Sequence, residues 1–63
     1  MYIVTIVYLG RESDEVEFEY SSHATDYAKQ IAQEGVQIKR GDEEWVYYPA
    51  HRIHAVFIEK KKK

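Results

Sequence analysis

Only one segment of this chain has the spacing of an amphipathic helix, and this limits the layers from which a fold can be built. Residues 24–34 place apolar side chains three and four residues apart, with polar side chains on the opposite face. The hydroxyls of Ser21 and Ser22 are candidate N-caps, and Gly35 stands where a left-handed C-cap is expected. A helix of about twelve residues is about 18 Å long, so it can cover only one face of a small sheet.

The other apolar segments predict β-strands. Residues 2–9 are apolar on both faces, as in a strand at the centre of a sheet. Residues 15–20 alternate glutamate with apolar side chains, so one face of this strand should be solvated. Residues 36–39 and 44–48 are separated by a Gly-Asp turn and predict a hairpin, and residues 53–58 predict a last strand.

The order of these segments predicts an α+β fold, ββαβββ, in which a small, mainly antiparallel sheet carries one helix on one face. A polar turn at residues 10–14 joins the first two strands. Five strands at about 4.8 Å spacing make a sheet about 20 Å wide, and one helix leaves one face of it uncovered. We expect this face to be partly acidic, from Glu15, Glu17 and Glu19, and partly aromatic, and to form an interface.

The small size of the chain predicts self-association. It has 63 residues and no cysteine. A domain of this size buries only about 60% of its extended-chain surface, and without disulfides the usual remaining support is a second copy, so we expect a homo-oligomer. The absence of asparagine and cysteine and a charged fraction of 32% are also found in thermophilic proteins. Residues 1–9 lack a basic region and are too short to span a bilayer, which predicts a cytoplasmic protein without a membrane contact.

The charges divide the chain into an acidic body and a basic tail. Residues 1–59 carry five Lys and Arg against eleven Asp and Glu, a balance of −6, and residues 60–63 are four lysines. We predict a single domain over residues 1–59 and a disordered basic tail over residues 60–63. The acidic body disfavours nucleic-acid binding, although a lysine tail can hold phosphates without sequence preference.

No residue pattern predicts catalysis or metal binding. His51 and His54 are three residues apart, but beside Pro49 and at the start of a strand their side chains should point to opposite sides. The chain has no triad order of serine, histidine and aspartate and no glycine-rich phosphate loop. A chain this short also has little room for a pocket. We therefore expect no enzyme, no metal and no cofactor.

Residues 45–54 combine aromatic, basic and histidine side chains and are the candidate binding segment. Strand alternation separates Trp45 and Tyr47, which we expect to face the helix, from Tyr48 on the other face. The aromatic rings and guanidinium groups are typical of binding hot spots and suit a nucleotide-like anion. An equally weighted interpretation is that one pair belongs to the core and the other to an ordinary surface. The predicted binding residues are Tyr48, His51, Arg52, His54 and Arg40.

These features predict a non-enzymatic binding module. We expect it to self-associate and to bind or block a protein partner or a small anionic, nucleotide-like ligand. The alternative is binding of single-stranded nucleic acid, in which bases stack on sheet aromatics and the lysine tail follows the backbone.

An apolar first strand, an acidic second strand and the closing segment Trp45-Val-Tyr-Tyr-Pro-Ala-His-Arg-Ile53 give the chain a recognisable layout. In this layout it resembles small β-rich proteins that are common in the genomes of bacterial viruses. The resemblance spans most of the chain and includes no diagnostic motif, so it carries over no site residue. It implies a non-enzymatic protein that assembles with itself and binds or blocks a host component.

Overall fold

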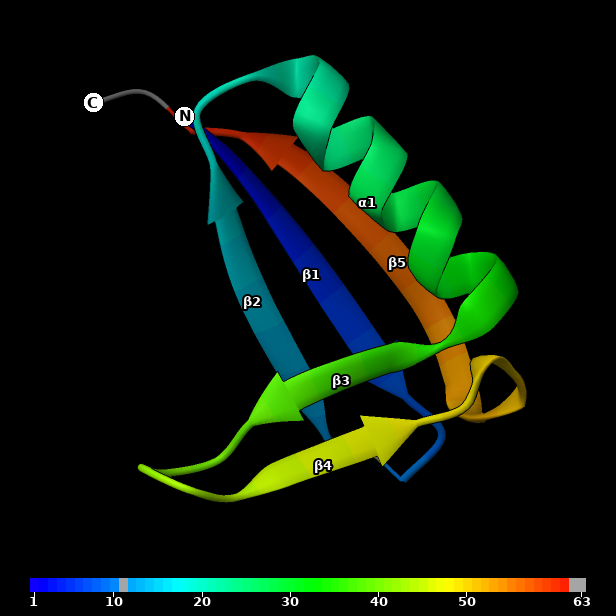
Figure 1. Ribbon diagram of the computed structural model, residues 1–63. Coiled ribbons are helices and arrows are strands. Elements are labelled where there is room, and N and C mark those ends of the chain that lie inside the picture. The colour runs from blue at the N-terminus through cyan, green and yellow to red at the C-terminus, as the bar shows by residue number, and fades with distance from the viewer. Residues whose placement is uncertain (11, 62–63) are drawn as a thin grey trace.

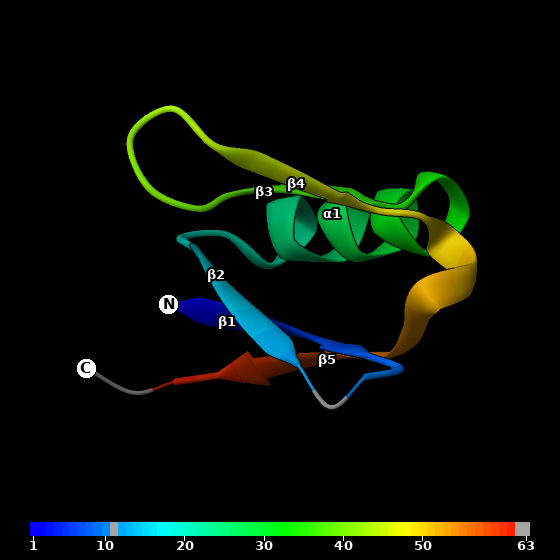
Figure 2. The ribbon, with the colours of Figure 1, turned by 90° about the horizontal axis from the view of Figure 1, so that it is seen from below.

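The chain folds into two layers (Figures 1 and 2). The structure is a computed structural model that describes residues 1–10 and 12–61. The first layer is a three-stranded antiparallel sheet in the order β2-β1-β5, and the second holds the helix and a two-stranded antiparallel sheet. The elements are β1 Tyr2–Tyr8, β2 Ser13–Phe18, α1 Ser21–Glu34, β3 Val36–Lys39, β4 Trp45–Tyr48, the 3-10 turn η1 Ala50–Arg52 and β5 Ile53–Lys60.

The predicted α+β class and the order ββαβββ are confirmed, but the five strands form two sheets instead of one. The β3-β4 hairpin crosses the end of the first sheet on the same side as α1 (Figure 1). It turns Val36 and Ile38 towards the core, so it covers the first sheet together with the helix. Short helix length explains this arrangement, because α1 alone cannot cover the whole face of three strands.

The core lies between the two layers. Val4, Ile6 and Tyr8 of β1 point towards the second layer and form one buried cluster with Ala24 and Ile31 of α1 and Val36 of β3. The opposite side of the first sheet has no described element packed on it, as Figure 2 shows below the three strands. We call this side the open face. The expectation that one sheet face remains uncovered is confirmed for the described residues.

The predicted cap is wrong at the N-terminal end of α1 and confirmed at its C-terminal end. Tyr20 is the N-cap residue and no side chain hydrogen-bonds there, so the predicted capping by Ser21 or Ser22 is wrong. At the other end Gly35 has a φ of 85° and donates its N–H to the carbonyl of Ile31 at 2.9 Å. The predicted glycine requirement at the C-cap is confirmed.

Every strand except β3 departs from its predicted bounds, and β1, which ends at Tyr8, and β4, which begins at Trp45, do so by one residue. β2 begins at Ser13 and ends at Phe18, and β5 continues through Lys60, the first residue of the predicted tail. Arg11 of the predicted turn and residues 62–63 of the tail lie outside the described residues. The register of β5 against β1 shifts between Val7 and Tyr8.

The register shift changes which residues of β5 face the core. Tyr8 pairs with Ile53 and Val7 with Ala55, which leaves His54 as the extra residue of a bulge. Strict alternation placed Ile53 on the same side as Ala55, and this assignment is wrong. Ile53 instead packs against the core together with Val56. In the described part of the chain, no helix is long and apolar enough to cross a membrane.

Candidate functional site

Two of the predicted binding residues, Arg40 and Tyr48, lie together in a polar network that joins the two sheets. Arg40 donates from Nη1 and Nη2 to the two carboxylate oxygens of Asp14, at 2.7 and 2.8 Å. Its Nη2 also donates to the Tyr48 hydroxyl at 3.3 Å, which in turn donates to Glu12 Oε2 at 2.8 Å. The Tyr8 hydroxyl donates to Asp14 Oδ2 at 2.9 Å, and the rings of Tyr8 and Tyr48 stack with centroids 3.9 Å apart.

The electrostatics of this network favour a structural role. Burial raises the pKa of the Tyr8 hydroxyl, and its hydrogen bond to the Asp14 carboxylate raises it further. Hydrogen bonds to Asp14 and Tyr48 raise the pKa of Arg40. Both donors therefore keep their protons, and the guanidinium charge is already matched by a carboxylate. A small anion would have to displace Asp14 to reach Arg40.

The other three predicted binding residues lie outside this network. His51 and Arg52 are exposed on η1, and His54 is exposed at the bulge of β5. Among residues 1–10 and 12–61, no hydrogen bond or ion pair links their side chains to Arg40 or Tyr48. The same residues contain no group of three or more His, Asp or Glu side chains that could hold a metal ion. The binding roles of these residues stay predictions.

The predicted orientation of β4 is wrong. Trp45 and Tyr47, expected to face the helix, are 56% and 60% exposed, and Tyr48, expected to face solvent, is half-buried against Tyr8. Alternation separates the two faces of a strand but does not say which one is buried. Here the pairing of Tyr48 with the buried Val36 decides it. The Tyr47 hydroxyl donates to the Glu34 carbonyl at the end of α1, at 2.7 Å.

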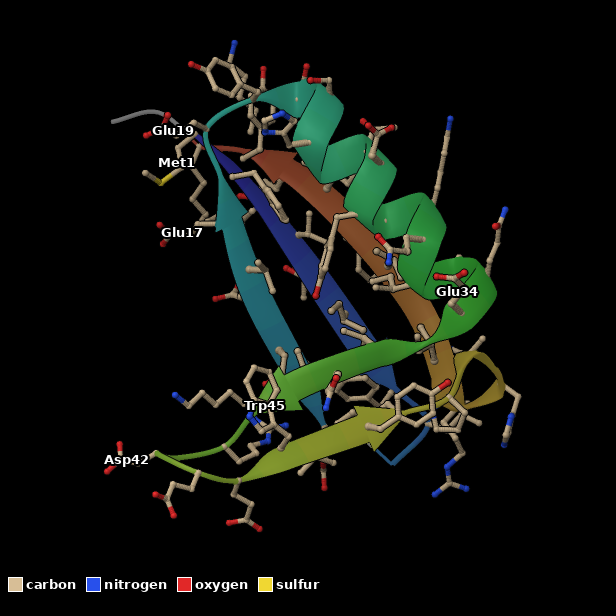
Figure 3. All side chains as sticks on the ribbon, in the orientation of Figure 1. Met1, Glu17, Glu19, Glu34, Asp42 and Trp45 are labelled. Atoms are coloured by element: carbon tan, nitrogen blue, oxygen red, sulfur yellow. The ribbon has the colours of Figure 1, made fainter. Side chains whose placement is uncertain are left out.

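The outward side of the β3-β4 hairpin is consequently aromatic. Trp45 pairs with Lys39 and Tyr47 with Gln37, and all four side chains are exposed. Figure 3 labels Trp45 on this hairpin, away from the acidic tip at Asp42. We call these four residues the hairpin outer face.

The open face of the first sheet carries glutamates in two of its three rows and is otherwise uncharged and partly apolar. Ile3 lies between Glu17 and Glu59 and is only 7% exposed, although no described element packs on this side of the sheet. Figure 3 shows Glu17 at the outer margin of β2. Phe57, beside Thr5 in the next row, is 58% exposed. Across β2, β1 and β5 the three rows are Glu17, Ile3 and Glu59; Glu15, Thr5 and Phe57; and Ser13, Val7 and Ala55.

Reasoning from the sequence identified the acidic part of the open face but missed Phe57 as its largest exposed apolar side chain. The alternation of β5 grouped Phe57 with Ala55, which is correct, but gave no sign of which side would be uncovered. The neighbouring Ile58, on the other side of β5, is 44% exposed. The sequence showed two consecutive apolar residues in this strand. Alternation alone could not tell that both side chains would be exposed.

No family model, curated protein or solved structure matches this chain. The resemblance to small proteins of bacterial viruses therefore stays a prediction. The open face and the hairpin outer face have to be interpreted from their own chemistry.

Proposed function

We propose that this chain is a non-enzymatic binding module that contacts a protein partner through the open face. The observation that carries the proposal is the exposure of Phe57 in the middle row of a sheet face that no described element covers. When a partner buries an exposed aromatic side chain of a sheet face, the burial contributes more than about 1 kcal/mol to the free energy of binding. The acidic margins of the face supply selectivity.

The charges of the open face favour a basic partner. Glu15, Glu17 and Glu59 are the only charged side chains in its three rows. Two open faces packed together would bring three carboxylates from each copy into one interface, against a single described lysine, Lys61, one pair beyond the three rows, so like-charge repulsion costs free energy. Self-association stays a prediction, and a second copy would have to use another surface.

The proposal can be tested by selecting peptides from a random display library on the immobilised protein. We expect selected peptides to be basic and to lose affinity at least about tenfold on a Phe57→Glu variant. Tyr20→Glu is the matched control, because Tyr20 is 60% exposed but precedes α1, away from the open face. Peptides that bind the wild-type and Phe57→Glu proteins equally would refute the proposal.

A second candidate function is single-stranded nucleic-acid binding at the hairpin outer face. The observation that favours it is the exposure of Trp45 and Tyr47 on one face beside Lys39, since bases stack on exposed aromatic rings and a cation holds a phosphate. The balance of −6 in residues 1–59 opposes it. The two candidates use different sides of the molecule, so they can be tested separately.

Trp45 is the single tryptophan, so its fluorescence reports directly on stacking. Under this candidate, titration with oligothymidine quenches the fluorescence, and Tyr47→Ala weakens the binding at least about tenfold. A variant without residues 61–63 separates stacking from attraction by the tail. Quenching that disappears with the tail would show electrostatic attraction alone, and an unchanged fluorescence would refute this candidate.

A further inference from the structure

The backbone of β5 can be divided into residues that bond to β1 and residues that do not. The Lys61 N–H donates to the Met1 carbonyl at 2.9 Å, one pair beyond the β1-β5 register. Bonded and non-bonded pairs alternate along an antiparallel ladder, so Glu59 and Phe57 also direct their backbone groups to β1. The residues between them direct their N–H and C=O groups away from β1, towards the free edge of the sheet.

This free edge of β5 is open to a further strand. The outward backbone groups belong to Val56, Ile58 and Lys60, and β1 is the only strand that pairs with β5 among the described residues. Of these three residues, only Lys60 at the end of the strand is charged. A continuous row of unpaired donors and acceptors on an apolar strand is a template for strand addition.

The opposite edge of the sheet differs. The Tyr8 N–H donates to the Glu12 carbonyl at 2.9 Å, so the outward groups of β2 belong to Ser13, Glu15 and Glu17. Glutamates beside free backbone groups discourage pairing. The contrast between the two edges indicates that β5, and not β2, is the edge on which a further strand can pair.

The exposure of two adjacent side chains indicates how the partner lies. Phe57 is on the open face and Ile58 is on the helix side of β5, and both are exposed. An occupant that lies flat on the open face would cover Phe57 and leave Ile58 in water. A strand added beside β5 contacts both, because its side chains alternate between the two faces.

A second copy of the folded chain does not fit this edge. Figure 1 shows α1 running beside β5 at the margin of the sheet. Antiparallel pairing of two β5 strands would set them about 4.8 Å apart with both helices on the same side, whereas packed helices need about 8–10 Å between their axes. An extended segment without a helix of its own avoids this clash.

We infer that the free edge of β5 takes up an extended segment of another protein as a fourth strand of the β2-β1-β5 sheet. The segment places apolar side chains beside Val56 and Ile58, an apolar or aromatic side chain beside Phe57, and a lysine or arginine beside Glu59. The inference rests on the proposed function, because the added strand also contacts the open face at Phe57. It adds the mode of binding and the chemistry of the partner.

The experiment uses the display-selected peptides and amide hydrogen exchange of the full chain measured by NMR. We expect a bound peptide to slow exchange of the Val56, Ile58 and Lys60 amides at least about tenfold, since added strands bond to these groups. Lys60→Pro removes one outward N–H and keeps the hydrogen bonds to β1, so it should lower the affinity for the peptide at least about tenfold. Lys60→Ala, which keeps the N–H, is the matched control and should change the affinity by less than about threefold.

The outcomes separate the inference from the proposed function. Peptides that depend on Phe57, leave the three amides unprotected and tolerate Lys60→Pro would overturn strand addition and leave open-face binding intact. If no selected peptide depends on Phe57, both proposals are overturned. A Glu59→Lys variant tests the partner's charge, and selected peptides that bind it as well as wild type would overturn the assignment of a cation beside Glu59. The exchange measurement needs no variant, so it holds even if Lys60→Pro fails to fold.

Discussion

Arg40 and Asp14 form a two-point ion pair, with N···O distances of 2.7 and 2.8 Å, between the end of β3 and the strand β2. The two residues are 26 positions apart in the chain and belong to different layers. The pair fixes the position of the hairpin over the first sheet, and planar two-point geometry gives it direction as well as attraction. It accounts for an arginine that sequence reasoning assigned to ligand binding.

Removal of Asp14 should destabilise the fold. Asp14→Ala takes away the acceptor of the buried Tyr8 hydroxyl and leaves Arg40 without its carboxylate. We expect the free energy of unfolding to fall by about 2 kcal/mol, measured by urea denaturation. Asp42→Ala, at the exposed tip of the hairpin, is the control and should change stability by less than about 0.5 kcal/mol. Equal stability of the two variants would contradict a structural role for the ion pair.

Stability should decline in alkaline solution because of Tyr8. Burial and the Asp14 carboxylate raise its pKa in the folded state above the ordinary value of 10.0. Above pH 10.0 the unfolded chain loses this proton while the folded protein keeps it, so the contribution of Tyr8 is complete below that pH and is lost as pH rises beyond it. Burial raises the pKa of Tyr27 in the same direction.

Above pH 10.0 the free energy of unfolding should fall by at most about 1.4 kcal/mol per pH unit for each such tyrosine. Urea denaturation at neutral pH and at several pH values above 10.0 measures it. Tyr8→Phe should be less stable than wild type at neutral pH, by about 1 to 2 kcal/mol, and should show a shallower alkaline decline. An identical decline in the two proteins would show that Tyr8 is not the responsible group.

Gly35 should not tolerate a side chain. Its φ is 85°, and a Cβ would stand 2.5 Å from the Tyr48 carbonyl oxygen and 2.9 Å from Pro49 Cα, both backbone atoms. We expect Gly35→Ala to lower the free energy of unfolding by about 3 kcal/mol or more. Gly41→Ala measures the cost of a positive φ without a clash, because Gly41 has a φ of 94° but open space around it. Its cost should be only about 1 to 2 kcal/mol, and equal costs for the two variants would contradict the close approach of α1 and η1.

The orientation of β4 makes opposite predictions for two neighbouring aromatics. Trp45 is exposed, so acrylamide should quench its fluorescence efficiently and Trp45→Ala should cost less than about 1 kcal/mol. Tyr48 stacks on Tyr8, and Tyr48→Ala should cost about 3 kcal/mol because it removes the stacked ring and the contact with the core. If acrylamide does not quench Trp45, or if Trp45→Ala lowers the free energy of unfolding more than Tyr48→Ala does, the orientation expected from the sequence would be the correct one.

The sequence by itself determined the elements of this protein. The spacing of residues 24–34 predicted the helix, the glutamates of residues 15–20 predicted a strand with one wet face, and Gly35 predicted the helix end. These features depend on neighbours in the chain, so local periodicity and backbone conformation suffice to recognise them. The length of the one helix also implied that a sheet face would stay uncovered.

Only the tertiary structure decided how the elements face one another. The split into two sheets, the bulge at His54 and the turn of Tyr48 towards Tyr8 each depend on contacts between residues distant in sequence. Alternation divides a strand into two faces, but the packing of the other layer selects which face is buried. For this reason Trp45 and Phe57 came to lie on surfaces while Arg40, assigned to a ligand, became the link between the layers.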